Sequence, residues 1–380
     1  MIPMNIDFPP HINFGKSIVD NIHIPNKKVL CLLTPSLDRH NDIGRRLQTA
    51  LAEQQAECLM VRPESGEPNS DALDRIVAQL PRNLDVVIGI GGGSTMDSAK
   101  FIAMLKVSGG RCADYEFGGP DITGALPIYL APTTSGSGSE ATSYAVATNS
   151  KTGRKFTLNH DLLFPRSVFI DPTLTIGLPP RFTVATALDA FIHCFEARLN
   201  RQDHQSIHPY AIQGMRLIRS ALDTALRFPD NLEARSQLSA ASVLGGVCIA
   251  TSRTGLIHTL SVAFSEFIDE PHGILNARML PFALNFNRAH YGGLLTRVVS
   301  KVWDKKIGSD EEAVAVVNRW VVDMLDRIGN APADWSWLHD KSDHLVDRIM
   351  QDKGLPAVNP REINANSIPS VVESVINSAS

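Results

Sequence analysis

Four side chains in the second half of the sequence have the types and spacing of a metal site. Asp189 and His193 are four residues apart in a segment with a helical pattern, so they share one helix face. His258 and His272 add two imidazole nitrogens from later segments. One carboxylate oxygen and three nitrogens suit Fe²⁺ or Zn²⁺ better than Mg²⁺ or Ca²⁺, which prefer oxygen ligands. Such an ion would polarise the oxygen of an alcohol or carbonyl group.

Two loops in the first half have compositions that suit a phosphate-bearing ligand. The first is a glycine run between a strand pattern and a helix pattern, consisting of Gly91, Gly92, Gly93 and Ser94. Small residues let a phosphate approach the backbone, and the free N–H groups at the start of a helix favour the anion. The second loop is rich in hydroxyl side chains, among them Thr133, Thr134 and Ser137. The alternatives are a tight turn that needs glycine for steric reasons and a polar surface loop.

The segments around these residues predict two different kinds of domain. The first half alternates strand patterns at 28–33, 57–61, 85–91, 126–132 and 167–171 with helix patterns at 42–56, 70–80 and 94–106. Such alternation predicts a parallel sheet covered by helices on both faces. The second half shows helix patterns only, at 183–199, 208–227, 231–252, 255–267, 273–291, 294–303, 310–328, 339–352 and 365–378. We expect Ser70 or Asp71 to cap the helix over 70–80, an α/β domain over 1–179 and an all-helical domain over 180–380, with LPPRF at 178–182 as the hinge.

Composition excludes several classes of protein. The 380 residues carry a net charge of only −4 and no basic run, which argues against a nucleic-acid partner. The N-terminus lacks a signal-peptide pattern, and no apolar stretch reaches the roughly 18 residues that a membrane span needs. The five cysteines are scattered, without a CxxC pair, which favours reduced thiols in a cytoplasm.

Four separated motifs resemble those of the iron-containing (group III) alcohol dehydrogenases. They are GGGSTMDSAK, PTTSGSGSEAT, LPPRFTVATALDAFIHCFEA and PHGILNARMLPFALNFN, and the tail NPREINANSI is similar as well. The resemblance runs over nearly the whole chain. It implies a dehydroquinate synthase-like fold, with a Rossmann-like α/β domain, an all-helical domain and a cleft between them. It also implies hydride transfer between NAD or NADP and a small alcohol or aldehyde, in a protein that is commonly a homodimer.

The resemblance assigns expected roles to individual residues. It implies that Asp189, His193, His258 and His272 hold the metal ion. It implies cofactor contacts from Gly91, Gly92, Gly93, Ser94, Thr133, Thr134, Ser137 and Lys155, and it matches Asp97 and Lys100 to family positions in the helix after the glycine run. We also count Thr34 and Asp97 among the expected cofactor-binding residues. We expect His272 and Arg253 to lie nearest the reacting groups.

Three positions depart from the family pattern. Val262 stands where many members have a histidine that is proposed to relay a proton, and valine cannot move one. Arg253 and Arg278 replace small or apolar residues near His258 and His272, and an arginine in a pocket suits a carboxylate, phosphate or phosphonate. The alternative for both arginines is exposure to solvent or pairing with an acid. Thr34 stands where many NAD-preferring members have an aspartate, so the sequence favours NADP, with Arg39 and His40 downstream and NAD still possible.

Two other function classes remain open at this point. A lyase-type cyclase resembling dehydroquinate synthase would use NAD transiently on a sugar phosphate, but it commonly has a different metal set and several lysines in its pocket. A non-catalytic relative would have no reason to keep all four ligands. The sequence therefore favours a metal-dependent dehydrogenase that acts as a reductase of a small, polar or anionic aldehyde.

Overall fold

The computed structural model describes residues 8–9, 11–35, 37, 42–202, 204–330 and 333–378. Arg39 and His40 therefore lie outside the described residues. The described chain forms two compact units, one over 8–177 and 230–239 and the other over 178–229 and 240–378. The sequence predicts a boundary two residues later, between 179 and 180, and does not predict the return of 230–239 to the first unit.

The first unit contains a six-stranded sheet in which all neighbouring strands are parallel. Its strands, in spatial order, are β1 (Ile12–Phe14), β8 (Ser167–Ile170), β5 (Ile128–Pro132), β4 (Val86–Gly91), β2 (Lys28–Leu33) and β3 (Glu57–Val61). The chain runs from β2 outward to β3 and then returns to the other side of β2 as β4. In doubly wound sheets, ligands bind outside the carboxyl ends of the strands at such a reversal.

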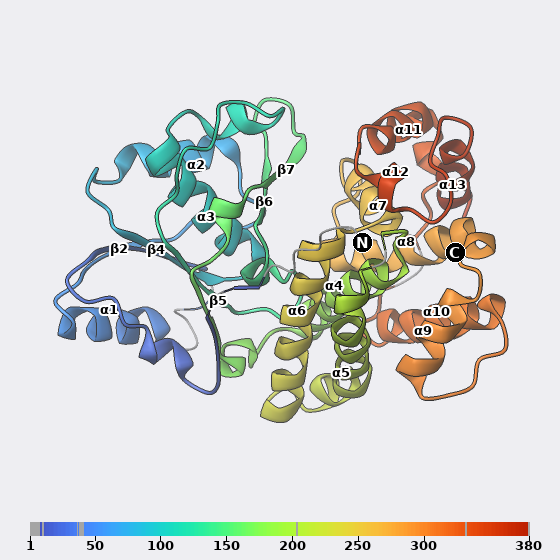
Figure 1. Cartoon of the computed structure of the whole chain (residues 1–380), viewed down its shortest axis with the longest axis horizontal. Coiled ribbons are helices and arrows are strands. Elements are labelled where there is room, and N and C mark those ends of the chain that lie inside the picture. Colours follow the sequence, from blue (N-terminus) through green and yellow to red (C-terminus); the bar gives the residue numbers. More distant parts are fainter. Residues whose placement is uncertain are drawn as a thin grey trace. The chain divides into compact units, whose positions relative to one another are not determined.

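Helices cover both faces of this sheet, as Figure 1 shows. The helices are α1 (Ile43–Glu53), α2 (Ser70–Gln79) and α3 (Gly93–Ser108). In β2, Val29, Cys31 and Leu33 pack in one core with α1, whereas Leu30 and Leu32 pack in a second core with α2 and α3. Successive side chains of a strand point to opposite faces, so the near-continuous apolar run of β2 serves both cores. The predicted α/β fold class is thus confirmed.

The predicted cap of α2 is wrong by one or two residues. The cap is Asn69, whose side chain accepts hydrogen bonds from the backbone of Asp71 and Ala72. Ser70 and Asp71 lie inside the first turn, because an N-cap oxygen reaches the amides two and three residues ahead.

The second unit is helical throughout its described residues. Its helices are α4 (Pro180–Leu199), α5 (His208–Arg227), α6 (Leu232–Ser252), α7 (Leu256–Phe264), α8 (His272–Asn287), α9 (Leu294–Trp303), α10 (Asp310–Asp326), α11 (Ser342–Met350), α12 (Leu355–Val358) and α13 (Ile368–Ile376). The start of α6, through Ser239, belongs to the first unit. This architecture confirms the predicted all-helical second domain.

Shorter elements complete the described chain. A separate antiparallel pair, β6 (Tyr144–Thr148) and β7 (Lys155–Asn159), follows the second predicted cofactor loop. Short 3₁₀ turns occur at Ile18–Asn21, Cys112–Tyr115, Ser139–Ala141, Asp161–Leu163, Pro172–Thr175, Gln205–Ile207, Arg288–His290 and Ser336–Lys341. No single described helix has the length and apolar character of a membrane span; the bent pair α6 and α7 meets that test by length and composition only.

Candidate metal centre and nucleotide loops

Helix α4 supplies two of the four predicted metal ligands. It begins with Pro180 in its first turn, has no internal glycine, and is buried along most of its length. Asp189 and His193 lie one turn apart on this helix, and both are buried. Glu196, three residues further on, lies on the same side and is also buried.

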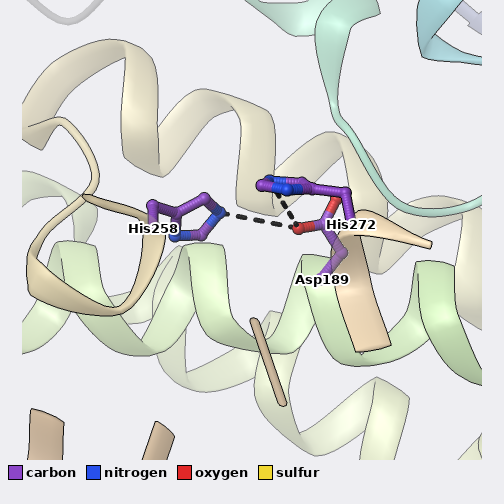
Figure 2. Close-up of side chains that lie close together, drawn as sticks. All are labelled: Asp189, His258 and His272. Carbon is purple, nitrogen blue, oxygen red and sulfur yellow. Dashed lines mark ion pairs between the residues drawn. The ribbon is translucent and has the colours of Figure 1, made fainter. Parts of the chain in front are cut away.

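Three of the predicted ligands converge on one point. One ligand atom each from Asp189, His258 and His272 can be chosen so that all three lie within 4.8 Å of one another. Figure 2 shows both imidazole rings directed at the same carboxylate oxygen. Asp189 Oδ1 is 3.5 Å from His258 Nε2 and 4.0 Å from His272 Nε2. These separations are near the ~3.4 Å expected between neighbouring ligands of a tetrahedral ion with ~2.1 Å bonds.

His193 lies at the edge of this group. Its Nε2 is 3.7 Å from the same oxygen of Asp189, and its ring stacks on that of His258 with centroids 4.7 Å apart. It is not part of the trio whose ligand atoms all lie within 4.8 Å of one another. The structure therefore brings three predicted ligands together and holds the fourth against two of them.

A glycine allows α8 to approach α4 at this point. Gly273 follows His272 at the start of α8, and a Cβ on it would collide with the carbonyl group of Ala185 and lie 3.0 Å from the Cβ of Asp189. The lack of a side chain at Gly273 thus lets His272 reach Asp189. The PHG motif therefore has a packing role besides the ligand role that the resemblance implies.

Glu196 fixes the chemical form of His258. Its carboxylate lies 2.6 Å from His258 Nδ1 and also accepts hydrogen bonds from the backbone N–H groups of Gly255 and Ile257. A carboxylate at Nδ1 keeps a proton on that nitrogen and leaves the Nε2 lone pair for a metal ion. Sequence reasoning missed Glu196, although its position seven residues after Asp189 on one helix is a usable signal.

The donor set fits a divalent ion of the Fe²⁺ or Zn²⁺ type. It offers one carboxylate oxygen and imidazole nitrogens, which these ions accept. Asn276, also missed by sequence reasoning, places its amide against the same three ligand atoms, and its Oδ1 is buried without a hydrogen-bond partner among the described residues. A buried cluster of polar groups that includes an oxygen without a hydrogen-bond partner is typical of a site that binds an ion.

The charges of the ligands respond strongly to one another. Burial alone would raise the pKa of Asp189, but the three neighbouring histidines hold it below its ordinary value. Burial lowers the pKa of His258, but hydrogen bonds to Asp189 and Glu196 outweigh it and raise the pKa from 6.5 to about 9. Asp189 therefore stays negative at neutral pH and attracts a cation.

The predicted cofactor residues of the first unit gather at the carboxyl edge of its sheet. Thr34 directly follows β2, and its N–H donates to the carbonyl of Ile90 in β4. The N–H of Thr133, which follows β5, donates to Gly91 at the end of β4. This edge includes the reversal between β2 and β4, where the fold favours ligand binding.

The two predicted loops touch each other. A Cβ on Gly92 would lie 3.5 Å from the hydroxyl of Thr134, and one on Gly93 would lie 2.9 Å from that of Ser137. Gly92 is the N-cap of α3, and Ser94 is half-buried in its first turn. The start of α3 and the hydroxyl loop thus form one surface with N–H and O–H groups, which suits a pyrophosphate.

Asp97 and Lys100 support this surface from inside. The sequence groups Asp97 with the cofactor contacts, but both of its oxygens are occupied within the protein, by the hydroxyl of Ser139 and the N–H of Val146. Lys100 is fully buried and donates to the carbonyls of Ser139, Thr142 and Tyr144. Burial raises the pKa of Asp97 and lowers that of Lys100 to about 8. Through these hydrogen bonds, Asp97 and Lys100 connect the segment after the hydroxyl loop to α3.

Three other residues named in the sequence analysis, Lys155, Arg278 and Val262, have ordinary structural surroundings. Lys155 begins β7 and pairs with Glu67 at 2.7 Å. Arg278 pairs with Glu270 at 2.9 Å, so the reading of Arg278 as a residue paired with an acid is the one that the structure supports. Val262 lies one turn after His258 on α7 and is half-buried.

Arg253 has an unusual backbone conformation and an exposed side chain. It follows the end of α6 in the left-handed region, with φ 62°, a position that helices usually give to glycine. Its exposed guanidinium lies over Gly354, where a side chain would collide with it, and makes no hydrogen bond or ion pair within the described residues. The carboxylate of Asp352, two residues before Gly354, accepts a hydrogen bond from the hydroxyl of Thr259, the residue after His258. The guanidinium thus lies beside a loop that is hydrogen-bonded to α7, the helix that contains His258.

Comparison with known proteins agrees with this geometry. The family "Iron-containing alcohol dehydrogenase" matches residues 9–172, and "Fe-containing alcohol dehydrogenase family, C-terminal" matches residues 183–376. Alcohol dehydrogenase 4 of Saccharomyces cerevisiae is 30% identical over 285 residues, which cover 73% of this chain and 74% of that protein. Sulfoacetaldehyde reductase of Bilophila wadsworthia is 29% identical over 267 residues, covering 70% of this chain and 68% of the relative.

A solved structure shares the whole fold. The sulfoacetaldehyde reductase of Bifidobacterium kashiwanohense, crystallised in complex with NAD⁺, has a TM-score of 0.86 and 24% identity and covers 100% of both chains. The two family matches together extend over both units. The chain belongs to the iron-containing alcohol dehydrogenase family.

Proposed function

We propose that this oxidoreductase reduces a small aldehyde that carries an anionic or strongly polar group, using a divalent ion and a nicotinamide nucleotide. The observation that carries the substrate class is Arg253, whose guanidinium has no hydrogen-bond or ion-pair partner among the described residues and whose strained backbone position is close in sequence to a candidate metal ligand. Non-glycine residues in the left-handed region cost of order 1 kcal/mol or more and cluster at functional sites.

The residues of the chain divide the work of this reaction. Asp189, His258 and His272, with His193 beside them, would hold the ion, and the glycine and hydroxyl loops would hold the nucleotide. When bound, the ion polarises the substrate oxygen and the nicotinamide supplies or accepts the hydride. Val262 offers no proton, so the proton comes from another group or from water.

Arg253 would bind the polar end of the substrate. A guanidinium offers a planar fork of N–H donors that matches carboxylate, sulfonate and phosphonate groups. The relative from Bilophila wadsworthia is named as a reductase of sulfoacetaldehyde, an aldehyde with a sulfonate group. Charge-assisted hydrogen bonds of this kind contribute about 1.5–3 kcal/mol, which corresponds to roughly 10- to 150-fold in kcat/KM.

The substitution Arg253→Gly tests this proposal without straining the backbone. Glycine suits φ 62°, so the unfolding temperature should stay the same or rise. We expect kcat/KM for aldehydes with a terminal sulfonate, carboxylate or phosphonate to fall at least about tenfold. Neutral aldehydes of equal length should be reduced as before. Equal activity of the variant on charged aldehydes would refute the role of Arg253, and a lack of any aldehyde reduction by the wild type would refute the function.

The remaining expectations from the sequence are part of the same proposal. We propose NADP(H) as the preferred cofactor, because Thr34 lacks the carboxylate that would repel a 2′-phosphate. Measuring kcat/KM with NADPH and with NADH tests this preference.

We propose a cytoplasmic homodimer. Its support is the free, scattered cysteines and the edge strand β1, which exposes Ile12 and Phe14. Light scattering measures the oligomeric state.

A further inference from the structure

One buried amide touches all three converging metal ligands. Asn276 lies one turn after His272 on α8 and is completely buried. Its Nδ2 is 2.8 Å from Asp189 Oδ1, 3.1 Å from His258 Nε2 and 3.2 Å from His272 Nε2. The residue belongs to the motif PHGILNARMLPFALNFN, but the sequence analysis gave it no role.

The three distances place the amide on the axis of the metal site. An atom that is nearly equidistant from three others lies close to the line through the centre of their triangle, perpendicular to its plane. The amide nitrogen of Asn276 therefore lies over the triangle formed by the three candidate ligand atoms, on one of its two sides.

The chemistry of the amide decides what it can do there. The NH₂ group is a donor and has no lone pair to offer a cation, whereas it can donate to the carboxylate of Asp189. Such a hydrogen bond fixes the orientation of the carboxylate, which is the role of residues that surround metal ligands. The same group also covers one side of the triangle.

We propose that Asn276 is a positioning residue of the metal centre, which orients Asp189 by hydrogen bonding and closes one side of the ligand triangle. This inference rests on the metal-dependent function proposed above. It goes beyond that function by making the geometry of the centre depend on a residue that does not itself hold the ion.

Two substitutions test the inference by metal affinity. Asn276→Leu keeps the approximate shape of the side chain and removes the donor. Asn276→Ala removes the donor and also the bulk that covers the triangle. We expect both to weaken Zn²⁺ binding about 10- to 100-fold, measured by competition with a chromophoric chelator on the full-length protein.

Asn287→Leu is the matched control. It removes a buried asparagine from the same helix, one that pairs with Asn359 rather than with a ligand. Its Zn²⁺ affinity should equal that of the wild type. Thermal unfolding monitored by circular dichroism checks that each variant folds.

Two outcomes would overturn the inference. Wild-type affinity in Asn276→Leu would show that the amide does not position the ligands. Weaker binding in Asn276→Leu with wild-type affinity in Asn276→Ala would show that the bulk of leucine, and not the loss of the hydrogen bond, disturbs the ligands. Because Zn²⁺ binding is measured without substrate, failure of aldehyde reduction leaves this test unaffected and refutes only the proposed function.

Discussion

At the scale of single residues, the glycines of the run are glycines for different physical reasons. A Cβ on Gly91 would lie 2.5 Å from the side chain of Thr95, so packing alone excludes a side chain there. A Cβ on Gly92 would make only ordinary contact, 3.5 Å from Thr134, and its φ of −72° is open to any residue. The steric explanation of the run therefore covers Gly91 and not Gly92. For Gly92 we propose close approach of a ligand, as the resemblance implies.

A pair of alanine substitutions separates these reasons. Gly92→Ala should cost at most about 1 kcal/mol of stability, the difference between glycine and alanine at an N-cap. It should weaken nucleotide binding about tenfold or more, because the new methyl group occupies the approach to the helix start. Gly91→Ala should instead destabilise the protein by about 1–3 kcal/mol through overpacking. Calorimetric titration with NADPH and NADH, together with thermal unfolding, measures both effects. Unchanged nucleotide affinity in Gly92→Ala would contradict the assignment.

Residue patterns in the sequence indicated the candidate metal ligands better than the groups around them. Asp189 and His193 stand out because a spacing of four places a carboxylate and an imidazole on one helix face. Glu196 and Asn276 are ordinary helical residues until the partner helices bring His258 to both of them. The strain at Arg253 is equally invisible in sequence, since it depends on where α6 ends.

At the scale of elements, the crossing of α8 over α4 determines whether the metal ligands meet. His272 is the first residue of α8, and the following glycine abuts the backbone of Ala185, one turn before Asp189. Rigid backbone atoms cannot yield as the end of a flexible side chain can. The distance between the two helices is therefore fixed by the absence of a side chain at Gly273.

Gly273→Ala should separate the two helices. The added methyl group meets a backbone carbonyl, so we expect a loss of stability at or above the usual overpacking range of about 1–3 kcal/mol. Metal affinity should fall as well, because His272 moves with the start of α8. Chemical denaturation and chelator competition measure the two effects. Gly308→Ala, whose Cβ would meet only the end of the Glu312 side chain at 3.3 Å, is the control. A variant with wild-type metal affinity would show that the close approach is not required.

Elements with long, periodic patterns were predictable, and short ones were not. Strand β2 and helix α5 match their predicted bounds because apolar periodicity extends over the whole element. Strand β1 has three residues, too few to show a period, and it forms only by pairing with the distant β8. Helix α12 has four residues and was missed for the same reason.

At the scale of the whole molecule, the sequence predicts two kinds of domain but not the continuity of α6. This helix begins in the α/β unit, where the hydroxyl of Ser239 is hydrogen-bonded to that of Ser135 in the hydroxyl loop. It ends next to the loop that leads to His258. In its middle, Gly245 lies against His193 and Ala190 of α4. One helix thus contacts the hydroxyl loop through its first turns and, through its later ones, the helix that bears two candidate metal ligands.

Removal of the metal should therefore affect defined parts of the chain. A ligand that binds only the native state stabilises it by about 2.7 kcal/mol at 100 times its dissociation constant, and local exchange reports where this stabilisation acts. With a chelator, hydrogen exchange should accelerate in α4, α7, α8 and the part of α6 after Ser239, while β4 and β5 keep their protection. Added nucleotide should protect the start of α3, the hydroxyl loop and the first turns of α6. Mass spectrometry of peptides that divide α6 near Ser239 reads out both responses. Equal acceleration of β4 and α4 on chelation would show that the ion stabilises the chain as one unit, against the two-unit description.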